Sequence, residues 1–356
     1  MADYEDPETL LQLAQPDPVF LEALQDFLKA PQPKDATDIE VMRQGRRIED
    51  QKRIDALPEF PDVSVTTKSI SMRDGHMSEI RIFTPTVPPS SKGRPLVVLI
   101  YGGGFVHGDN QSTAPYSLPI VSVYNAVVVN ITYRLAPEFK FPIQGNDVWD
   151  TLQWLDSNAK SLGADLSAGF VLGGESAGGN LAAVTAVKAV SKSLPSGAKL
   201  TGAWLSIPWL LDAAPKGYED TYLARDQNKS AAIINAELLE RIKEIWRPDV
   251  SSPEFSPFNS LELVNDQHPP TYIQVCGMDP LRDDGLIYER VLREKGVETL
   301  VDVYPGVTHA HWAMFPFLEI SRKSMVDSIL GLGWLLGKMV PVEDIEESLG
   351  KLAADI

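Results

Sequence analysis

The sequence has little cysteine, a deficit of basic residues and no long apolar run. Its 356 residues include one cysteine, Cys276, so no intrachain disulfide can form and a reducing, cytoplasmic setting is expected. Lysine and arginine number 32 against 49 acidic residues, and the net charge of -17 argues against nucleic acid and anionic membranes as partners. No apolar stretch reaches the roughly 18 residues that cross a bilayer, so no membrane insertion is expected. The acidic N-terminus lacks the basic and apolar parts of a secretory signal.

Short, continuously apolar segments alternate with helical patterns through much of the chain. Such segments predict strands covered on both faces, and the helices between them predict parallel pairing, which is α/β architecture. Ahead of these segments, residues 63–67 and 80–83 flank Asp74-Gly75, a pair suited to a tight turn, and predict an antiparallel hairpin. The predicted buried strands are residues 96–101, 126–132, 170–172, 202–206, 271–276 and 299–304.

Two regions depart from this alternation. The first precedes every strand and places apolar side chains at helical spacing, interrupted by Pro31 and Pro33. The second mixes charged, aromatic and proline residues without a strand. We expect both to form a helical cap over the carboxyl ends of the strands, where Trp209 and its neighbours would line an apolar chamber or pack the cap against the core. The expected domains are an N-terminal cap segment 1–60, a core of residues 61–207 and 270–356, and a cap insertion 208–269.

The strongest chemical signal is the run GGESAGGN at residues 173–180. It contains G-x-S-x-G between a predicted strand and an alanine-rich helix, the setting in which this motif presents a nucleophilic serine. Gly174 and Gly178 must lack side chains, because a turn that pushes the Ser176 hydroxyl out of the sheet brings the flanking backbone together. A phosphate-binding turn is the alternative, but both the Lys-Ser/Thr ending of a P-loop and G-x-G-x-x-G spacing are missing.

A second glycine cluster, Tyr101-Gly102-Gly103-Gly104-Phe105, follows the apolar run that ends at Ile100. Residues without side chains can offer unhindered backbone N–H groups to a ligand. We therefore expect Gly102 and Gly103, with the N–H of Ala177, to stabilise a tetrahedral oxyanion. The alternative is a plain flexible turn.

A nucleophilic serine needs a base within hydrogen-bonding reach. We expect His76, beside the hairpin turn, and His268, before two prolines, to be exposed, and His107 to be structural. His309 and His311 follow the last predicted strand at the sheet edge where the serine emerges, so the base is expected in this pair. The chain has five histidines in all, at positions 76, 107, 268, 309 and 311.

The acid of a serine triad comes between serine and histidine in the chain order of this motif. Asp279 follows the predicted strand 271–276 at the same edge of the sheet and is the expected acid. Asp283 and Asp284 are rivals that lie deeper in the next loop or helix. No cysteine or histidine spacing suggests a metal site, and the expected chemistry needs no cofactor.

These motifs together resemble the hormone-sensitive-lipase-like branch of the α/β-hydrolases, which includes bacterial and fungal carboxylesterases. The resemblance covers roughly residues 95–312. It implies the α/β-hydrolase fold, a mostly parallel central sheet flanked by helices with a helical cap, and a catalytic triad of Ser176, Asp279 and His309. The matching stretches are residues 101–105 (YGGGF), 133–138 (YRLAPE), 174–178 (GESAG), 279–283 (DPLRD) and 306–309 (GVTH).

The chain departs from the family pattern at two places. Tyr101 replaces the usual histidine before the glycines, and Ala310-His311-Trp312 replaces the usual Gly-Phe after the catalytic histidine. Neither departure removes a member of the triad, and Tyr101 is expected to alter mainly the packing of the loop and the wall of the pocket. The family is also commonly dimeric, which makes a homodimer an expectation by resemblance.

The expected function is hydrolysis of small, largely apolar carboxylic esters by a serine carboxylesterase, with a small-molecule ester as the partner. One alternative keeps the triad in a lactonase, amidase or acyltransferase, because fold and triad do not fix the acyl acceptor. The other is a non-catalytic small-molecule receptor of hydrolase fold. Relatives of that kind have lost the catalytic histidine, whereas His309 is present here.

Overall fold

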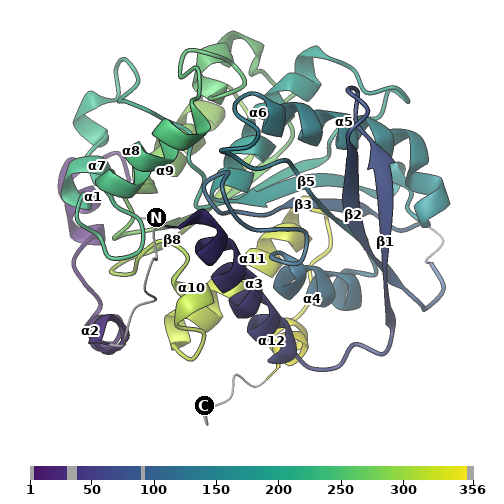
Figure 1. Ribbon diagram of the computed structural model, residues 1–356, viewed down its shortest axis with the longest axis horizontal. Coiled ribbons are helices and arrows are strands. Elements are labelled where there is room, and N and C mark those ends of the chain that lie inside the picture. The colour runs from purple at the N-terminus through teal and green to yellow at the C-terminus, as the bar shows by residue number, and fades with distance from the viewer. Residues whose placement is uncertain (1–3, 30–37, 90–92, 351–356) are drawn as a thin grey trace.

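The chain is built around an eight-stranded sheet with helices on both faces (Figure 1). The structure is a computed structural model and describes residues 4–29, 38–89 and 93–350. The strand order is β1-β2-β4-β3-β5-β6-β7-β8. The strands are β1 (Val63–Ser71), β2 (Met77–Pro85), β3 (Leu96–Ile100), β4 (Val127–Ile131), β5 (Phe170–Glu175), β6 (Gly202–Ser206), β7 (Thr271–Cys276) and β8 (Thr299–Tyr304).

The predicted fold class is confirmed. All six predicted strands are present, and β4, β3, β5, β6, β7 and β8 pair in parallel. Five of them are buried as predicted, but β8 lies at the edge of the sheet and is only partly buried. The predicted hairpin is β1 and β2, which joins the same sheet because β2 pairs antiparallel with β4. The main difference is β5, which continues beyond Leu172 to Glu175, since Gly173 and Gly174 still pair with β3 and β6.

Successive residues of the central strands face opposite helical layers. In β3, whose five residues are all buried, Leu96 and Val98 belong to one apolar cluster and Val97 to the other. The first cluster packs under α5 (Ile143–Asn158), α6 (Ala177–Ser191) and α9 (Arg282–Glu294). The second packs under α4 (Ala114–Tyr124), α11 (Glu319–Leu335) and α12 (Val342–Leu349). Burial on both faces explains why these strands are apolar without alternation.

Two helical regions lie outside this layered core. The N-terminal region forms α1 (Pro7–Leu13), α2 (Pro18–Lys29) and α3 (Ile39–Asp55), while the predicted break at Pro31 and Pro33 falls outside the described residues. Residues 208–269 contain no strand and form α7 (Ala224–Gln227), α8 (Ala236–Trp246) and the 3-10 segment Pro257–Leu263. A short helix, α10 (His311–Met314), follows β8. Across the described part of the chain, no helix has the length and apolar character of a membrane span.

Candidate active site

Ser176 lies at the sharp turn between β5 and α6. Its backbone has φ 55° and ψ -116°, a left-handed conformation that a residue with a Cβ rarely adopts. The Ser176 N–H donates to the carbonyl oxygen of Ser206 at 2.8 Å, and its carbonyl accepts from the Asn180 N–H at 3.0 Å. The G-x-S-x-G motif therefore occupies the strand-to-helix junction predicted for it, with the strained serine held by backbone hydrogen bonds on both sides.

The glycines of this turn have no room for a side chain. A Cβ on Gly174 would lie 2.1 Å from the Gly178 carbonyl oxygen, and a Cβ on Gly178 would lie 2.2 Å from the Ile100 carbonyl oxygen. Real Cβ atoms do not approach backbone that closely. The prediction that both positions require glycine, because the flanking backbone converges, agrees with these distances.

Gly174→Ala is expected to lower the free energy of unfolding by about 3 kcal/mol, because the turn must open to admit the methyl group. The matched control is Gly145→Ala in α5, where a Cβ would meet nothing within 4 Å. That change should leave stability unchanged or raise it by up to about 1 kcal/mol. Urea unfolding of both variants measures the difference, and equal stabilities would contradict the steric account of the turn.

The structure brings Ser176, His309 and Asp279 into one hydrogen-bonded chain. Ser176 Oγ lies 3.0 Å from His309 Nε2, and His309 Nδ1 lies 2.6 Å from Asp279 Oδ2. Asp279 is fully buried, and its other carboxylate oxygen accepts the Leu281 N–H at 2.8 Å. This geometry fits a histidine that donates from Nδ1 to the carboxylate and accepts the serine proton at Nε2.

The loops that carry the acid and the histidine are tied together by backbone hydrogen bonds. The Gly277 N–H donates to the Tyr304 carbonyl at 2.8 Å, and the Met278 N–H donates to the Val307 carbonyl at 2.9 Å. These bonds extend the pairing of β7 and β8 past the ends of both strands. Asp279 and the loop that follows β8 therefore leave the sheet side by side, which explains how residues 30 positions apart meet.

The rival carboxylates, Asp283 and Asp284, bind other groups. Asp283 pairs with the fully buried Arg282 at 2.7 Å and accepts the N–H groups of Leu223 and Ala224. Asp284 accepts the N–H groups of Leu210 and Leu211 and pairs with Arg225 at 3.0 Å. Both carboxylates thus hold residues 208–269 against α9. The structure does not bring either of them to His309.

The second histidine of the pair lies in a packing cluster instead. His311 Nδ1 lies 3.5 Å from Cys276 Sγ, and the ring packs edge-on to Phe20 and Trp312. Burial lowers the pKa of His311 to about 4, and burial likewise lowers the pKa of His107 to about 4. Both rings are therefore neutral near pH 7. Only His309 of the two candidates reaches Ser176.

The expectation that His268 is exposed is wrong. It is 4% exposed, its Nδ1 lies 2.9 Å from the Pro269 carbonyl oxygen, and its ring packs against Tyr288 of α9. The residues before a buried strand are covered here because α9 packs over that end of β7. A proline-rich approach to a strand therefore does not imply solvent exposure.

Burial of His268 should make stability fall in acid. Burial lowers the pKa of His268 to about 4, below the ordinary value of 6.5 that applies to the unfolded chain. The unfolded state then binds more protons, so the stabilisation is complete above pH 6.5 and is lost as the pH falls towards 4. His268→Gln should flatten the stability curve between pH 6.5 and 5 by up to about 1.4 kcal/mol per pH unit. Identical slopes for the variant and the unmodified protein in urea unfolding would contradict this.

The glycine cluster after β3 lies directly against the serine turn. A Cβ on Gly102 would be 2.8 Å from the Glu175 carbonyl oxygen and 3.1 Å from Ser176 Cβ. The next residues, Gly103 and Gly104, have φ of 129° and 57°, so the loop needs glycine for its conformation as well as for its closeness. Ala177 begins α6, where a backbone N–H has no partner within the helix. The backbone of Gly102 and the first residue of α6 therefore both lie next to Ser176.

Tyr101 replaces a histidine without entering the triad. Its hydroxyl donates to the Tyr133 carbonyl at 3.0 Å, the Tyr133 hydroxyl donates back to the Tyr101 carbonyl at 3.2 Å, and the two rings stack. The side chain is 1% exposed. Tyr101 therefore packs against the loop that it begins, which agrees with the expected effect on loop packing, while its effect on the pocket wall stays a prediction.

Sequence reasoning missed the buried carboxylate of Glu175, next to the serine. It accepts hydrogen bonds from the Tyr116 hydroxyl at 3.1 Å and from the Trp312 indole N–H at 3.4 Å. The second bond joins the serine turn to the helix that follows His309. The signal that could have indicated this role is a charged residue at the end of an otherwise apolar strand, where it joins an apolar helix.

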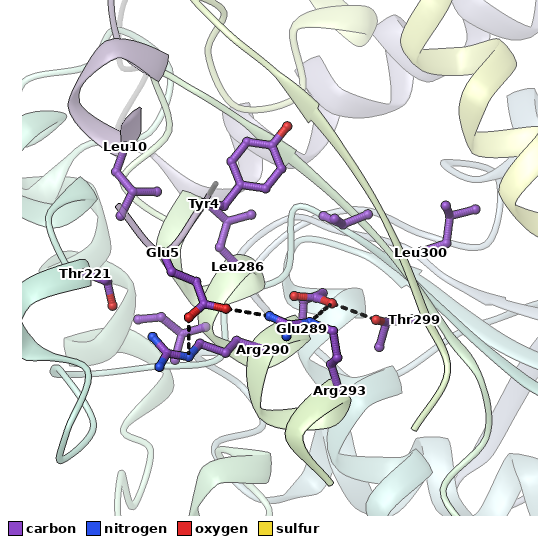
Figure 2. A pocket seen from close by; sticks show the side chains of 12 residues that line it. Tyr4, Glu5, Leu10, Thr221, Leu286, Glu289, Arg290, Arg293, Thr299 and Leu300 are labelled. Atoms are coloured by element: carbon purple, nitrogen blue, oxygen red, sulfur yellow. Dashed lines mark hydrogen bonds and ion pairs between the residues drawn. The ribbon is translucent and has the colours of Figure 1, made fainter. Parts of the chain in front are cut away.

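A surface pocket of about 540 Å³ lies apart from these residues (Figure 2). It is lined by α9, β8 and the N-terminal segment, and none of its lining residues belongs to the serine, histidine and aspartate chain. Its charges are internally paired, since the Glu5 carboxylate lies between Arg290 and Arg293, at 3.2 and 2.7 Å (Figure 2). None of the residues that line this pocket is a serine, cysteine or histidine.

Comparison with known proteins supports the family resemblance. A family model described as α/β-hydrolase fold matches residues 97–313. An AB hydrolase superfamily protein of Schizosaccharomyces pombe is 35% identical over 291 residues, or 81% of this chain and 84% of the relative. The versiconal hemiacetal acetate esterase of Dothistroma septosporum is 34% identical over 251 residues, or 69% and 74%. The crystal structure of vibralactone cyclase is 29% identical, with a TM-score of 0.83 over 92% of this chain and 96% of that one.

Fold, site and relatives together define a carboxylic ester hydrolase. The chain belongs to the α/β-hydrolase family whose model it matches, in the branch that is similar to hormone-sensitive lipase. The predicted family and enzyme class are thereby confirmed. The roles of individual site residues stay predictions.

Proposed function

We propose that this hydrolase is a serine carboxylesterase that cleaves small, largely apolar esters through an acyl-enzyme on Ser176. The observation that carries the proposal is the continuous chain from Ser176 Oγ to His309 Nε2, at 3.0 Å, and from His309 Nδ1 to Asp279, at 2.6 Å. A serine hydroxyl is a weak nucleophile until a positioned base takes its proton. No cofactor is required for this chemistry.

In the proposed mechanism His309 accepts the Ser176 proton as Oγ attacks the ester carbonyl carbon. The Asp279 carboxylate orients the imidazole and stabilises its charged form. Negative charge on the carbonyl oxygen is met by the N–H groups of Gly102, Gly103 and Ala177. His309 then protonates the leaving alkoxide, and water activated by the same imidazole hydrolyses the acyl-enzyme.

The preference for apolar esters is supported by what covers the glycine loop. A Cβ on Gly104 would lie 2.7 Å from Ile242 Cδ1, so α8 packs directly on this loop. The Phe105 ring stacks on Trp246 of the same helix, with centroids 3.6 Å apart, and Trp209 packs beside both. We propose that α8 and the rest of residues 208–269 form a cap with α1, α2 and α3, as expected from the sequence.

A panel of p-nitrophenyl esters of increasing acyl length tests this function on the purified protein. Hydrolysis of the acetate or butyrate with kcat/KM above about 10⁴ M⁻¹s⁻¹ would support a small-ester carboxylesterase. A protein that neither hydrolyses the panel nor reacts with a fluorophosphonate would instead be the non-catalytic receptor. The p-nitroanilide of the same acyl group is assayed beside each ester. Cleavage of the anilide but not of the ester would assign an amidase.

Acyl transfer within one substrate is the second candidate. It is favoured by the similarity to a solved protein named vibralactone cyclase, which spans nearly the whole chain. In this reaction the acyl group on Ser176 would pass to a hydroxyl of the same molecule rather than to water. Incubation with a hydroxy ester distinguishes the two, since a lactone product supports cyclisation and a free hydroxy acid supports hydrolysis.

A further inference from the structure

Helix α3 contacts the body of the protein through several polar groups and through Ile54, which packs against the second apolar cluster. Its single buried residue is Asp50, which accepts the Ser112 hydroxyl and pairs with Arg46 at 2.8 Å. Its apolar residues Val41 and Ile48 are 36% and 50% exposed. A helix with so small an apolar contact depends on specific polar contacts to stay in place. In Figure 1 this helix crosses the front of the molecule beside α4, which it also contacts.

One α3 side chain reaches the glycine loop beside the nucleophile. Arg43 Nε donates to the Val106 carbonyl oxygen at 2.9 Å, and Arg43 Nη2 donates to the Ala136 carbonyl oxygen at 3.0 Å. The guanidinium is oriented by Glu138, whose two carboxylate oxygens each accept a bond at 2.8 Å. The Arg43 side chain is 14% exposed, so it is largely withdrawn from water.

These bonds fix the segment that shapes the glycine loop. The N–H groups of Val106 and His107 donate to the Gly103 carbonyl at 3.0 and 3.1 Å, so the loop folds back on itself. Gly103 and Gly104 adopt positive φ freely as glycines, but Phe105, with φ 63°, is strained. The Ala136 N–H donates to the Phe105 carbonyl at 2.9 Å, which ties the loop after β4 to the glycine loop. Arg43 adds a second link, because it bonds to the Val106 and Ala136 carbonyls at once. Strained backbone persists only where surrounding contacts determine it.

We propose that Arg43 is a positioning residue for the oxyanion site, through which α3 holds the glycine loop in its active conformation. The proposal rests on the proposed function, because it assigns Gly102 and Gly103 as oxyanion donors. The hydrogen bonds of Arg43 go to two backbone carbonyls and to Glu138, so in this proposal it acts through the loop. A planar guanidinium suits this task because it can donate in several fixed directions at once, which the lysine ammonium cannot do in the same plane.

The test compares Arg43→Met and Arg43→Lys with Glu138→Gln. Arg43→Met is expected to lower kcat for p-nitrophenyl butyrate by about 10- to 100-fold, since removing one oxyanion donor outright costs 10²- to 10³-fold. The KM should change less than about 3-fold, because the loss concerns the transition state. The kcat of Arg43→Lys should lie between those of Arg43→Met and the unmodified protein. Glu138→Gln weakens the ion pair but leaves both carbonyl bonds, so its kcat should fall less than about 3-fold.

Two further readouts distinguish a role of Arg43 in positioning the oxyanion site from a role only in holding α3 to the fold. Rates are expressed per competent site, counted by fluorophosphonate labelling taken to completion, so misfolded protein does not contribute. The affinity of a trifluoromethyl ketone, which forms a tetrahedral oxyanion adduct with serine, should fall at least 10-fold in Arg43→Met. Losses of melting temperature and competent sites alone, with unchanged kcat per site and ketone affinity, would overturn the inference. If the unmodified protein neither hydrolyses esters nor binds the ketone, the proposed function itself is overturned, and the inference with it.

Discussion

Ser176→Ala is expected to lower kcat for a short p-nitrophenyl ester by about 10⁵-fold or more, because it removes the hydroxyl that lies 3.0 Å from His309 Nε2 and would form the acyl-enzyme. Removal of the hydroxyl should not disturb the turn, since the backbone hydrogen bonds to Ser206 and Asn180 do not involve the side chain. Stopped assays with purified protein, compared with the buffer rate, measure the loss.

Ser321→Ala is the matched control for this change. Ser321 is also buried, in α11, and its hydroxyl has no hydrogen-bond partner among the described residues. Its removal should leave activity within about 2-fold of the unmodified protein. Circular dichroism and thermal melting should show both variants folded. Ester turnover by folded Ser176→Ala within 10-fold of the unmodified protein would rule out Ser176 as the nucleophile.

His309→Gln should cost about as much as loss of the serine, roughly 10⁵-fold in kcat, because base and nucleophile act as a unit. The contrast is His311→Phe, which keeps a ring in the cluster formed with Phe20 and Trp312. It should retain activity within about 5-fold, since His311 does not reach Ser176. The pair of variants decides between the two histidines that the sequence left open.

A large kcat loss in His311→Phe with a normal melting temperature would contradict this assignment. Its buried ring then would act on the reaction through Cys276 or the short helix that it begins. A loss of kcat that accompanies a lower melting temperature would instead show that His311 contributes to packing. Measuring kcat per fluorophosphonate-reactive site separates the two causes.

Much of the fold could be predicted because buried parallel strands have a strong sequence pattern. Apolar, β-branched runs between helices located β3 to β8, and Asp74-Gly75 located the hairpin. The serine turn could be predicted because its geometry demands glycine on both sides, at Gly174 and Gly178. Position at the carboxyl edge of the sheet then limited the histidine to two neighbours, and chain order limited the acid to Asp279 and its rivals.

The remaining features depend on contacts between segments far apart in sequence. His268 is buried because α9 covers it, and nothing in its own neighbourhood predicts that. Arg43 reaches Val106 across 63 positions from a helix whose sequence looks merely solvent-exposed. His309 reaches Ser176 whereas His311, two positions later, lies against Cys276, and both contacts join segments far apart in sequence. None of these contacts has a local pattern.

Labelling with a fluorophosphonate, followed by peptide mapping, tests the central claim most directly. The reagent phosphonylates a serine whose proton a neighbouring base removes, and it needs no knowledge of the natural substrate. We expect one adduct per chain, on the peptide that contains Ser176, with esterase activity falling in proportion to labelling. Full labelling of another residue, or unlabelled Ser176 in a protein that hydrolyses esters, would contradict the account.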